Sequence, residues 1–311
     1  MIRDGATYDE QVTVRNFVNA GSSITIQSFP GSGLQPVVAP PTGSTAAFQV
    51  VNASVNILGL AVTPEGDVAY GIYASSAYVT ISSVVVSTGS GAAQIWVSAI
   101  TLGSWSQMSY SSVSVGDAHG VQLLSGSTKT AISFSTSAVS GIGKYALYLN
   151  NADSNTVTRS YLSNSADAAA RFEAGSDKNI LSLSTVTSSA DGASALYFNG
   201  SDSNTVTGSY LINLAGTGAE LLSGADYNLI TQSTMVSNAA AYRALYISGS
   251  DSNTVTGGYL KNAAGIGAWL ASGSDRNTII LSTITTGGAG SSALYIAGSA
   301  TNTITQSYVI N

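Results

Sequence analysis

The chain of 311 residues contains no cysteine, a single histidine and only 8% charged residues. The absence of cysteine excludes a disulfide framework and a thiolate metal site. The net charge of −6 and the scarcity of Lys and Arg argue against a nucleic-acid partner, which requires clustered basic side chains. No apolar run is as long as the about 20 residues that a transmembrane helix needs, so no membrane span is predicted. The apolar content of 44% excludes disorder driven by charge.

What the chain does contain is a repeat marked by seven asparagines. They follow one another at intervals of 24 or 25 residues and are Asn155, Asn179, Asn204, Asn228, Asn253, Asn277 and Asn302. A fixed period of this length, with strand-forming residues between Gly, Ser, Asn and Asp turns, is typical of a solenoid. We expect an all-β fold in which each coil buries its apolar side against its neighbours.

The residues around each asparagine indicate which side chains point inward. Two positions after each asparagine the residue is apolar, as at Val157 and Leu181, and five positions after it the residue is small, as at Ser160. Period-2 spacing places the asparagine and the apolar residue on the same face. We therefore predict a buried asparagine ladder whose side-chain amides hydrogen-bond to one another along the axis.

A second repeat of 49 residues spans two coils. The triplet Ala-Leu-Tyr starts at Ala146, Ala195, Ala244 and Ala293. A coil of 24–25 residues accommodates three short strands and three turns, and we predict one domain over residues 1–311. Within it, residues 1–94 form irregular coils, including a loop from Pro30 to Pro41, and residues 95–311 form regular coils.

The repeat resembles a known family. Asn204-Thr-Val-Thr-Gly-Ser-Tyr-Leu211, after a strand such as Ala195–Phe198, is similar to the repeat of pectin-lyase-like right-handed parallel β-helix proteins with carbohydrate-binding and sugar-hydrolase repeats. Residues 8–14 and 23–31 resemble the first coils of such proteins. The resemblance implies a right-handed parallel β-helix. For function it implies an enzyme, a carbohydrate binder or a segment of a long repetitive bacterial surface protein.

If the protein is an enzyme, the resemblance implies a polysaccharide lyase or a glycoside hydrolase, which need an acid and a base at the substrate. The best local cluster joins Glu65 and Asp67 with Asp117 and His119, all in Gly-containing loops that lead into strands. The alternative is that these are solvated loop residues.

A column of aspartates precedes the asparagines by two residues. Its members are Asp153, Asp177, Asp202, Asp226, Asp251 and Asp275. Stacked carboxylates about 5 Å apart could share a hard cation such as Ca²⁺. The alternative is that each aspartate closes its own turn through a bond to the backbone. No other metal or cofactor is predicted.

Two tyrosine columns recur in alternate coils. One contains Tyr148, Tyr197, Tyr246 and Tyr295, and the other, which we select as the candidate ligand site, contains Tyr161, Tyr210, Tyr259 and Tyr308. Exposed aromatic rings can stack on sugars, whereas the alternative is cross-coil packing within the sheet.

From these patterns we predict a non-enzymatic structural or adhesive segment of a larger secreted or cell-surface protein, with a polysaccharide or host glycan as partner. A near-periodic array gives no coil a unique set of reactive groups, and ends without a polar cap predict end-to-end self-association. One alternative is a polysaccharide lyase or glycoside hydrolase with its site in the N-terminal third. A second is an ice-binding protein that uses an outward Thr-x-Thr face, as at Thr156 and Thr158.

Overall fold

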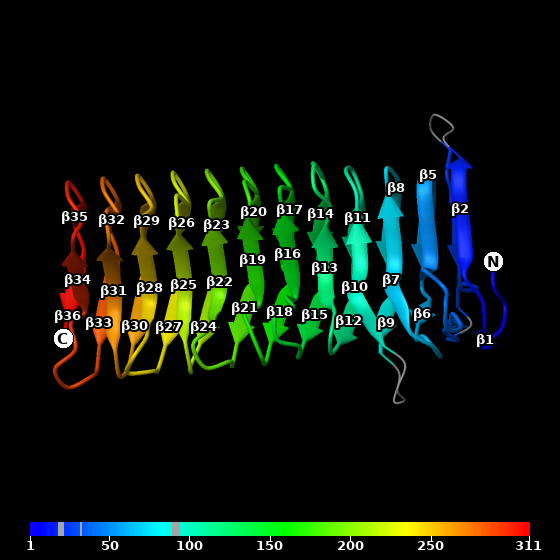
Figure 1. The fold of residues 1–311 in the computed structure, drawn as a ribbon, viewed down its shortest axis with the longest axis horizontal. Helices are drawn as coiled ribbons and strands as arrows, with labels where there is room; N and C mark the ends of the chain where they lie inside the picture. Colours follow the sequence, from blue (N-terminus) through cyan, green and yellow to red (C-terminus); the bar gives the residue numbers. More distant parts are fainter. Residues whose placement is uncertain (18–21, 32, 89–93) are drawn as a thin grey trace.

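The computed structural model describes residues 1–17, 22–31, 33–88 and 94–311. Over these residues the chain forms parallel β-strands and no helix, and the coils stack side by side along one long axis (Figure 1). The predicted all-β solenoid with three short strands per regular coil is confirmed. No helix in the described ranges is long and apolar enough to cross a membrane.

The strands form three faces that run along the axis. The first face contains β2 (Val12–Phe17), the start of β5 (Ala46–Leu58), β7 (Val68–Ser75), β10 (Ile95–Leu102), β13 (His119–Leu123), β16 (Leu147–Asn150), β19 (Ala170–Glu173), β22 (Ser194–Asn199), β25 (Thr217–Leu222), β28 (Arg243–Ser248), β31 (Ile266–Ala271) and β34 (Leu294–Ala297). The second face contains β3 (Ile24–Gln27), the end of β5, β8 (Tyr78–Ser82), β11 (Gln107–Ser109), β14 (Ala131–Ser133), β17 (Thr156–Thr158), β20 (Ile180–Ser182), β23 (Thr205–Thr207), β26 (Leu229–Thr231), β29 (Thr254–Thr256), β32 (Thr278–Ile280) and β35 (Thr303–Thr305).

The third face is a separate 13-stranded sheet. It contains β1 (Thr7–Tyr8), β4 (Val37–Val38), β6 (Ala61–Val62), β9 (Val85–Ser87), β12 (Ser112–Val115), β15 (Thr136–Val139), β18 (Tyr161–Asn164), β21 (Thr185–Ser188), β24 (Tyr210–Asn213), β27 (Thr234–Ser237), β30 (Tyr259–Asn262), β33 (Thr283–Thr286) and β36 (Tyr308–Ile310). The predicted loop from Pro30 to Pro41 is therefore partly wrong, because β4 lies within it and pairs with β1 and β6.

The core forms because buried and outward residues alternate along each strand. In β16, Leu147 and Leu149 are fully buried while the residues between and after them face outward. Inward residues of successive coils then touch, as the rings of Phe172 and Phe198 do at 5.0 Å between centroids. These contacts make the core a continuous apolar column. Each buried Leu or Phe in it stabilises the fold by about 1.5–3 kcal/mol relative to an exposed one.

Two corners of each regular coil place a residue in the left-handed region. One lies directly before each ladder asparagine, as at Ser154 (φ 57°), and the other lies before the small residue that follows the second-face strand, as at Leu183 (φ 50°). Glycine takes this second position at Gly208 and Gly257. The backbone can therefore turn sharply enough to separate three-residue strands from the next face.

The asparagine ladder is buried as predicted, but its bonding differs from the prediction. The Oδ1 atom of Asn179 accepts the backbone N–H of Asn155 at 2.8 Å, and the same bond at 2.8 Å links each later pair up to Asn277 and Asn302. Only Asn155 and Asn179 also bond amide to amide, at 3.1 Å. A backbone N–H at the corner has no strand partner, so it competes successfully for the side-chain oxygen.

The aspartate column bonds to the next coil and not within its own turn. Asp153 Oδ1 accepts the backbone N–H of Asp177 at 2.9 Å, and the same contact recurs along the column until Asp275 accepts from Ala300. The alternative that each aspartate bonds to the backbone of its own turn is therefore wrong, because the backbone partner belongs to the next coil. Within the described ranges, no group of three or more His, Cys, Asp or Glu side chains could hold a metal ion, and the Ca²⁺ site stays a prediction.

The outward threonines of the second face do not form an unbroken array. In register, Ile180 and Leu229 interrupt one column of threonines and Ile280 interrupts the other, and Ile180 is 41% exposed. These aliphatic side chains interrupt the regular hydroxyl spacing on which the ice-binding alternative depended.

Candidate functional site

One outward position of the first face carries aromatic or charged side chains in seven consecutive coils. The strand register aligns Tyr148, Arg171, Tyr197, Glu220, Tyr246, Trp269 and Tyr295. Parallel pairing places each about 4.8 Å from the next along the axis. In a chain with so few charges, this column is where acid, base and aromatic groups gather.

Arg171, near one end of this column, is paired with Glu173, which lies two residues further along the same strand. Arg171 Nε lies 2.5 Å from Glu173 Oε2, and Arg171 Nη1 donates to the Tyr145 hydroxyl at 2.9 Å. The other oxygen of Glu173 accepts from the Tyr148 hydroxyl. The guanidinium also lies over the rings of Tyr145 and Tyr197. This network fixes the positions of a carboxylate and a cation on the surface of the sheet.

His119 belongs to the same cluster. Its ring stacks on Tyr148 at 4.5 Å and on Tyr145 at 5.3 Å, and its Nδ1 accepts the backbone N–H of Tyr145 at 3.1 Å. Burial, aided by the charges of Lys144 and Arg171, lowers the pKa of His119 to about 4, although Glu173 opposes the shift. The imidazole is therefore neutral at pH 7 and can accept or donate a hydrogen bond without carrying charge.

Glu220 lies two coils beyond Arg171 and Glu173, and its surroundings differ from those of Glu173. Burial raises the pKa of its carboxyl above the usual 4.5, while Ser194, Thr217 and Arg243 oppose the shift. Ser194 and Thr217 are almost completely buried, yet their hydroxyl oxygens have no hydrogen-bond partner of normal geometry. A desolvated carboxyl beside two buried hydroxyls is a candidate proton donor.

Arg243 continues the surface on the far side of Glu220. Its guanidinium lies 4.1 Å from the centroid of the Trp269 ring and 4.9 Å from that of Tyr246. The buried Nε of Arg243 and Nε1 of Trp269 have no acceptor. Trp269 also contacts Tyr295, at 5.4 Å between centroids. These rings and donors form a platform next to Glu220.

The structure separates the residues that were predicted as a catalytic cluster. His119 joins the network above, whereas Glu65 and Asp67 are exposed in the turn between β6 and β7, and Asp67 Oδ1 accepts the backbone N–H of Gln94 at 3.0 Å. Asp117 is exposed in the turn before β13. The strand order places the first pair two coils away from Asp117 and His119.

The tyrosine column chosen as a ligand site lies on the third face. Tyr161, Tyr210, Tyr259 and Tyr308 are 41–73% exposed and alternate in register with threonines. Threonine neighbours separate the rings, and no titratable side chain stands beside them in register. Sugar binding there stays a prediction.

Sequence reasoning missed Arg171, Glu173, Glu220 and Arg243. The signal for two of them is present in the repeat, because Arg171 and Glu220 lie 49 residues apart, each following an alanine in the coils between the Ala-Leu-Tyr triplets. A charge at an outward position where other coils carry tyrosine marks a departure from the repeat. The neighbours that surround it could not be predicted, because they depend on side-chain directions.

Comparison with known proteins agrees with this architecture. A family model described as "Right handed beta helix region" matches residues 99–260, more than half of the chain. The chain belongs to the right-handed β-helix family. The predicted handedness is thereby confirmed, as is the resemblance to the pectin-lyase-like proteins. A search of curated proteins finds no match.

Several solved structures share the fold at low identity. DFA-IIIase from Arthrobacter chlorophenolicus A6 in complex with DFA-III has a TM-score of 0.58 at 13% identity, over 98% of this chain and 85% of that one. The A-module of the Azotobacter vinelandii mannuronan C-5 epimerase AlgE6 has a TM-score of 0.53 at 11% identity, over 97% and 84%. The periplasmic alginate epimerase AlgG has a TM-score of 0.50 at 8% identity, over 90% and 73%.

These comparisons correct the functional prediction. The similar structures are named as enzymes, so the prediction of a non-enzymatic structural or adhesive segment is wrong, and its alternative of a carbohydrate-active enzyme fits better. The physical reason lies on the first face. A near-periodic array does not leave every coil without unique reactive groups, because Arg171, Glu173, Glu220 and Arg243 each occupy a single coil.

Proposed function

We propose that the protein is a carbohydrate-active enzyme that hydrolyses a polysaccharide lying along the first face. The observation that carries this proposal is the pairing of Glu220, whose pKa is raised by burial, with Glu173, which is held by Arg171 and Tyr148, on one surface of aromatic rings. Two carboxyl groups in contrasting environments are what acid–base cleavage of a glycosidic bond requires.

Glu220 is the general acid in this proposal. Its raised pKa keeps a larger fraction protonated near neutral pH, and it would donate that proton to the leaving sugar oxygen. Glu173 is the second carboxylate and would activate water. The two residues are two coils apart, about 10 Å along the axis. That separation lies closer to the about 6.5–9.5 Å of an inverting pair, which leaves room for water, than to the about 5–5.5 Å of a retaining pair, so inversion is expected.

The aromatic side chains would bind the substrate. Tyr197 lies between Arg171 and Glu220 in the register, and Tyr246, Trp269 and Tyr295 extend the surface beyond Glu220. Apolar ring faces beside hydroxyl and N–H donors match the two-sided character of a sugar ring. A polysaccharide partner also agrees with the extracellular or cell-surface location expected from the sequence.

The experiment is a screen of polysaccharides for new reducing ends and for unsaturated products. Hydrolysis predicts reducing ends alone, lost in Glu220→Gln and Glu173→Gln. Glu65→Gln tests the site first expected in the N-terminal third, and Glu10→Gln, in an exposed turn, is the matched control. If Glu65→Gln abolishes activity while Glu220→Gln does not, the placement of the site is wrong. Unsaturated products would show that the enzyme cleaves by elimination and not by hydrolysis.

A further inference from the structure

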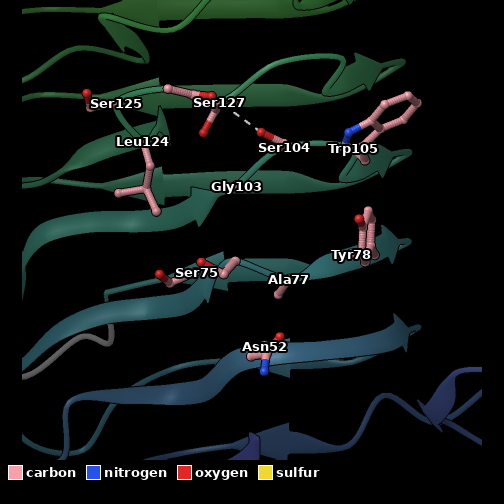
Figure 2. Close-up of a pocket in the computed structure, with 12 residues that line it drawn as sticks. Asn52, Ser75, Ala77, Tyr78, Gly103, Ser104, Trp105, Leu124, Ser125 and Ser127 are labelled. Atoms are coloured by element: carbon pink, nitrogen blue, oxygen red, sulfur yellow. Dashed lines mark hydrogen bonds between the residues drawn. The ribbon is translucent and has the colours of Figure 1, made fainter. Parts of the chain in front are cut away.

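A cleft at the corner between the first and second faces lies apart from the column around Glu220. It has a volume of about 450 Å³ and crosses the coils of β5, β7, β10 and β13. Figure 2 shows Tyr78 and Trp105 at one end of it and Ser75, Leu124 and Ser125 at the other. Its size lies within the range of about 300–1,000 Å³ that is usual for small-ligand pockets.

Two exposed aromatic residues form one wall. Tyr78 and Trp105 occupy equivalent positions in successive coils, since β8 and β11 pair in the same register, and each is 52% exposed. Other aligned aromatic rings contact each other, such as Tyr110 and Phe134, which stack at 5.1 Å, but the Tyr78 and Trp105 rings make no ring contact. Lys129 covers one side of Trp105, with Nζ 4.1 Å from the ring centroid. The aromatic surfaces that remain are open to a ligand.

The corner at Trp105 points a large aromatic side chain outward from the solenoid. Trp105 has φ 63°, in the left-handed region that penalises bulky residues. Later coils place residues of every size at the same corner with φ of 56–59°, namely Lys129, Ser154, Lys178, Ser203, Tyr227, Ser252, Arg276 and Thr301. An exposed tryptophan there gains little burial in return for the strain. The left-handed backbone belongs to the coil geometry, and what distinguishes this corner is that Trp105 and Tyr78 are both exposed beside the cleft.

The rest of the lining is polar and uncharged. It consists of serine, asparagine, glycine, alanine and leucine. The hydroxyls of Ser75 and Ser76 form no hydrogen bond with other described residues, whereas Ser104 Oγ accepts the backbone N–H of Thr128 at 3.0 Å. Hydroxyl and amide groups opposite aromatic faces suit a neutral, hydroxyl-rich ring, while an anion would find no cation on the lining itself.

We propose that this corner cleft is a second carbohydrate-binding site, for a neutral oligosaccharide that stacks on Trp105 and Tyr78. It spans three coil steps, about 14 Å along the axis, so it takes several sugar units of a chain. The site is independent of the proposed hydrolytic site, since none of its lining residues belongs to the column around Glu220.

Calorimetric titration of the full chain with neutral gluco-, xylo- and fructo-oligosaccharides, and with an oligouronate, tests the proposal. Trp105→Ala and Tyr78→Ala are each expected to weaken neutral-sugar binding at least tenfold. Tyr227→Ala is the matched control, because Tyr227 is an exposed aromatic residue at the equivalent corner of a later coil. That variant is expected to bind like the unaltered protein.

Folding and activity are checked alongside binding. The binding comparison needs only one of Trp105→Ala and Tyr78→Ala to retain the β-sheet circular dichroism of the unaltered protein. Cleavage of a short soluble substrate is expected to persist in both variants. A protein that binds none of the neutral sugars, or binds them equally well after both substitutions, overturns the proposal. If the protein binds only the oligouronate, and Lys129→Met abolishes that binding, the proposal that the ligand is a neutral sugar is wrong.

Discussion

Arg171 Nε and Glu173 Oε2 lie 2.5 Å apart on one strand, with side chains only 26% and 17% exposed. Removing Arg171 would leave Glu173 partly desolvated without its cation. We expect Arg171→Met to lower the free energy of unfolding by about 1–3 kcal/mol, measured by urea denaturation. A double-mutant cycle with Glu173→Gln isolates the pair, and a coupling energy near zero would contradict the assignment.

The chain offers a matched control for that experiment. Arg276 Nη2 lies 2.7 Å from Asp251 Oδ2, but the arginine side chain is 61% exposed. Solvent screens such a pair, and we expect Arg276→Met to change stability by less than about 1 kcal/mol. The contrast shows whether burial, and not the ion pair alone, stabilises the first-face network.

The asparagine ladder predicts a cost that depends on position along the rod. Asn228 Oδ1 accepts the backbone N–H of Asn204, and Asn228 Nδ2 donates to the Ser201 carbonyl at 3.0 Å. Asn228→Ala leaves both groups buried and unpaired, so we expect a loss of about 2–4 kcal/mol in the free energy of unfolding. Asn302→Ala, in the last coil and partly exposed, should cost clearly less. Equal effects would show that the ladder bonds are not what stabilises the coils.

The ladder and the first-face network separate what the sequence predicts well from what it predicts poorly. Ladder residues such as Asn155 and Asn228 recur with the coil period, so their burial follows from periodicity alone. Arg171 and Glu220 break the period, and their function depends on neighbours such as Ser194, which meet them only through the register between strands. The fold was therefore predictable from the repeat. Within the candidate site, only His119 and the first-face tyrosines could be identified from the sequence.

Strain at the corners predicts a stabilising substitution. Leu281 has φ 52° and is 61% exposed, and glycine occupies the equivalent position at Gly208 and Gly257. A leucine in this region costs about 1–2 kcal/mol, so Leu281→Gly should raise the melting temperature once the greater freedom of glycine in the unfolded chain is subtracted. Leu214→Gly, at an exposed position with ordinary φ, should not. A lower melting temperature for Leu281→Gly would show that the corner does not strain the leucine.

His119 predicts a loss of stability in acid. Its pKa is about 4 in the folded chain and about 6.5 when unfolded, so the unfolded state binds the proton first. The stabilisation is complete above pH about 6.5 and is lost as pH falls towards about 4, by up to about 3 kcal/mol. Urea denaturation of the unaltered protein and of His119→Gln at several pH values measures this difference. Parallel curves for the two proteins would contradict it.

Glu220 predicts how the proposed reaction depends on pH and on the leaving group. A general acid must be protonated, so the rate should fall as pH rises through the raised pKa of Glu220. Glu220→Gln keeps the shape but cannot donate a proton, and should reduce cleavage of a natural glycosidic bond about 10²–10⁴-fold. An aryl glycoside with an acidic phenol needs less protonation, so the same variant should lose much less activity on it. Proton NMR of the first product anomer completes the test, since inversion is expected from the two-coil separation. An equal loss on both substrates would assign Glu220 a structural role.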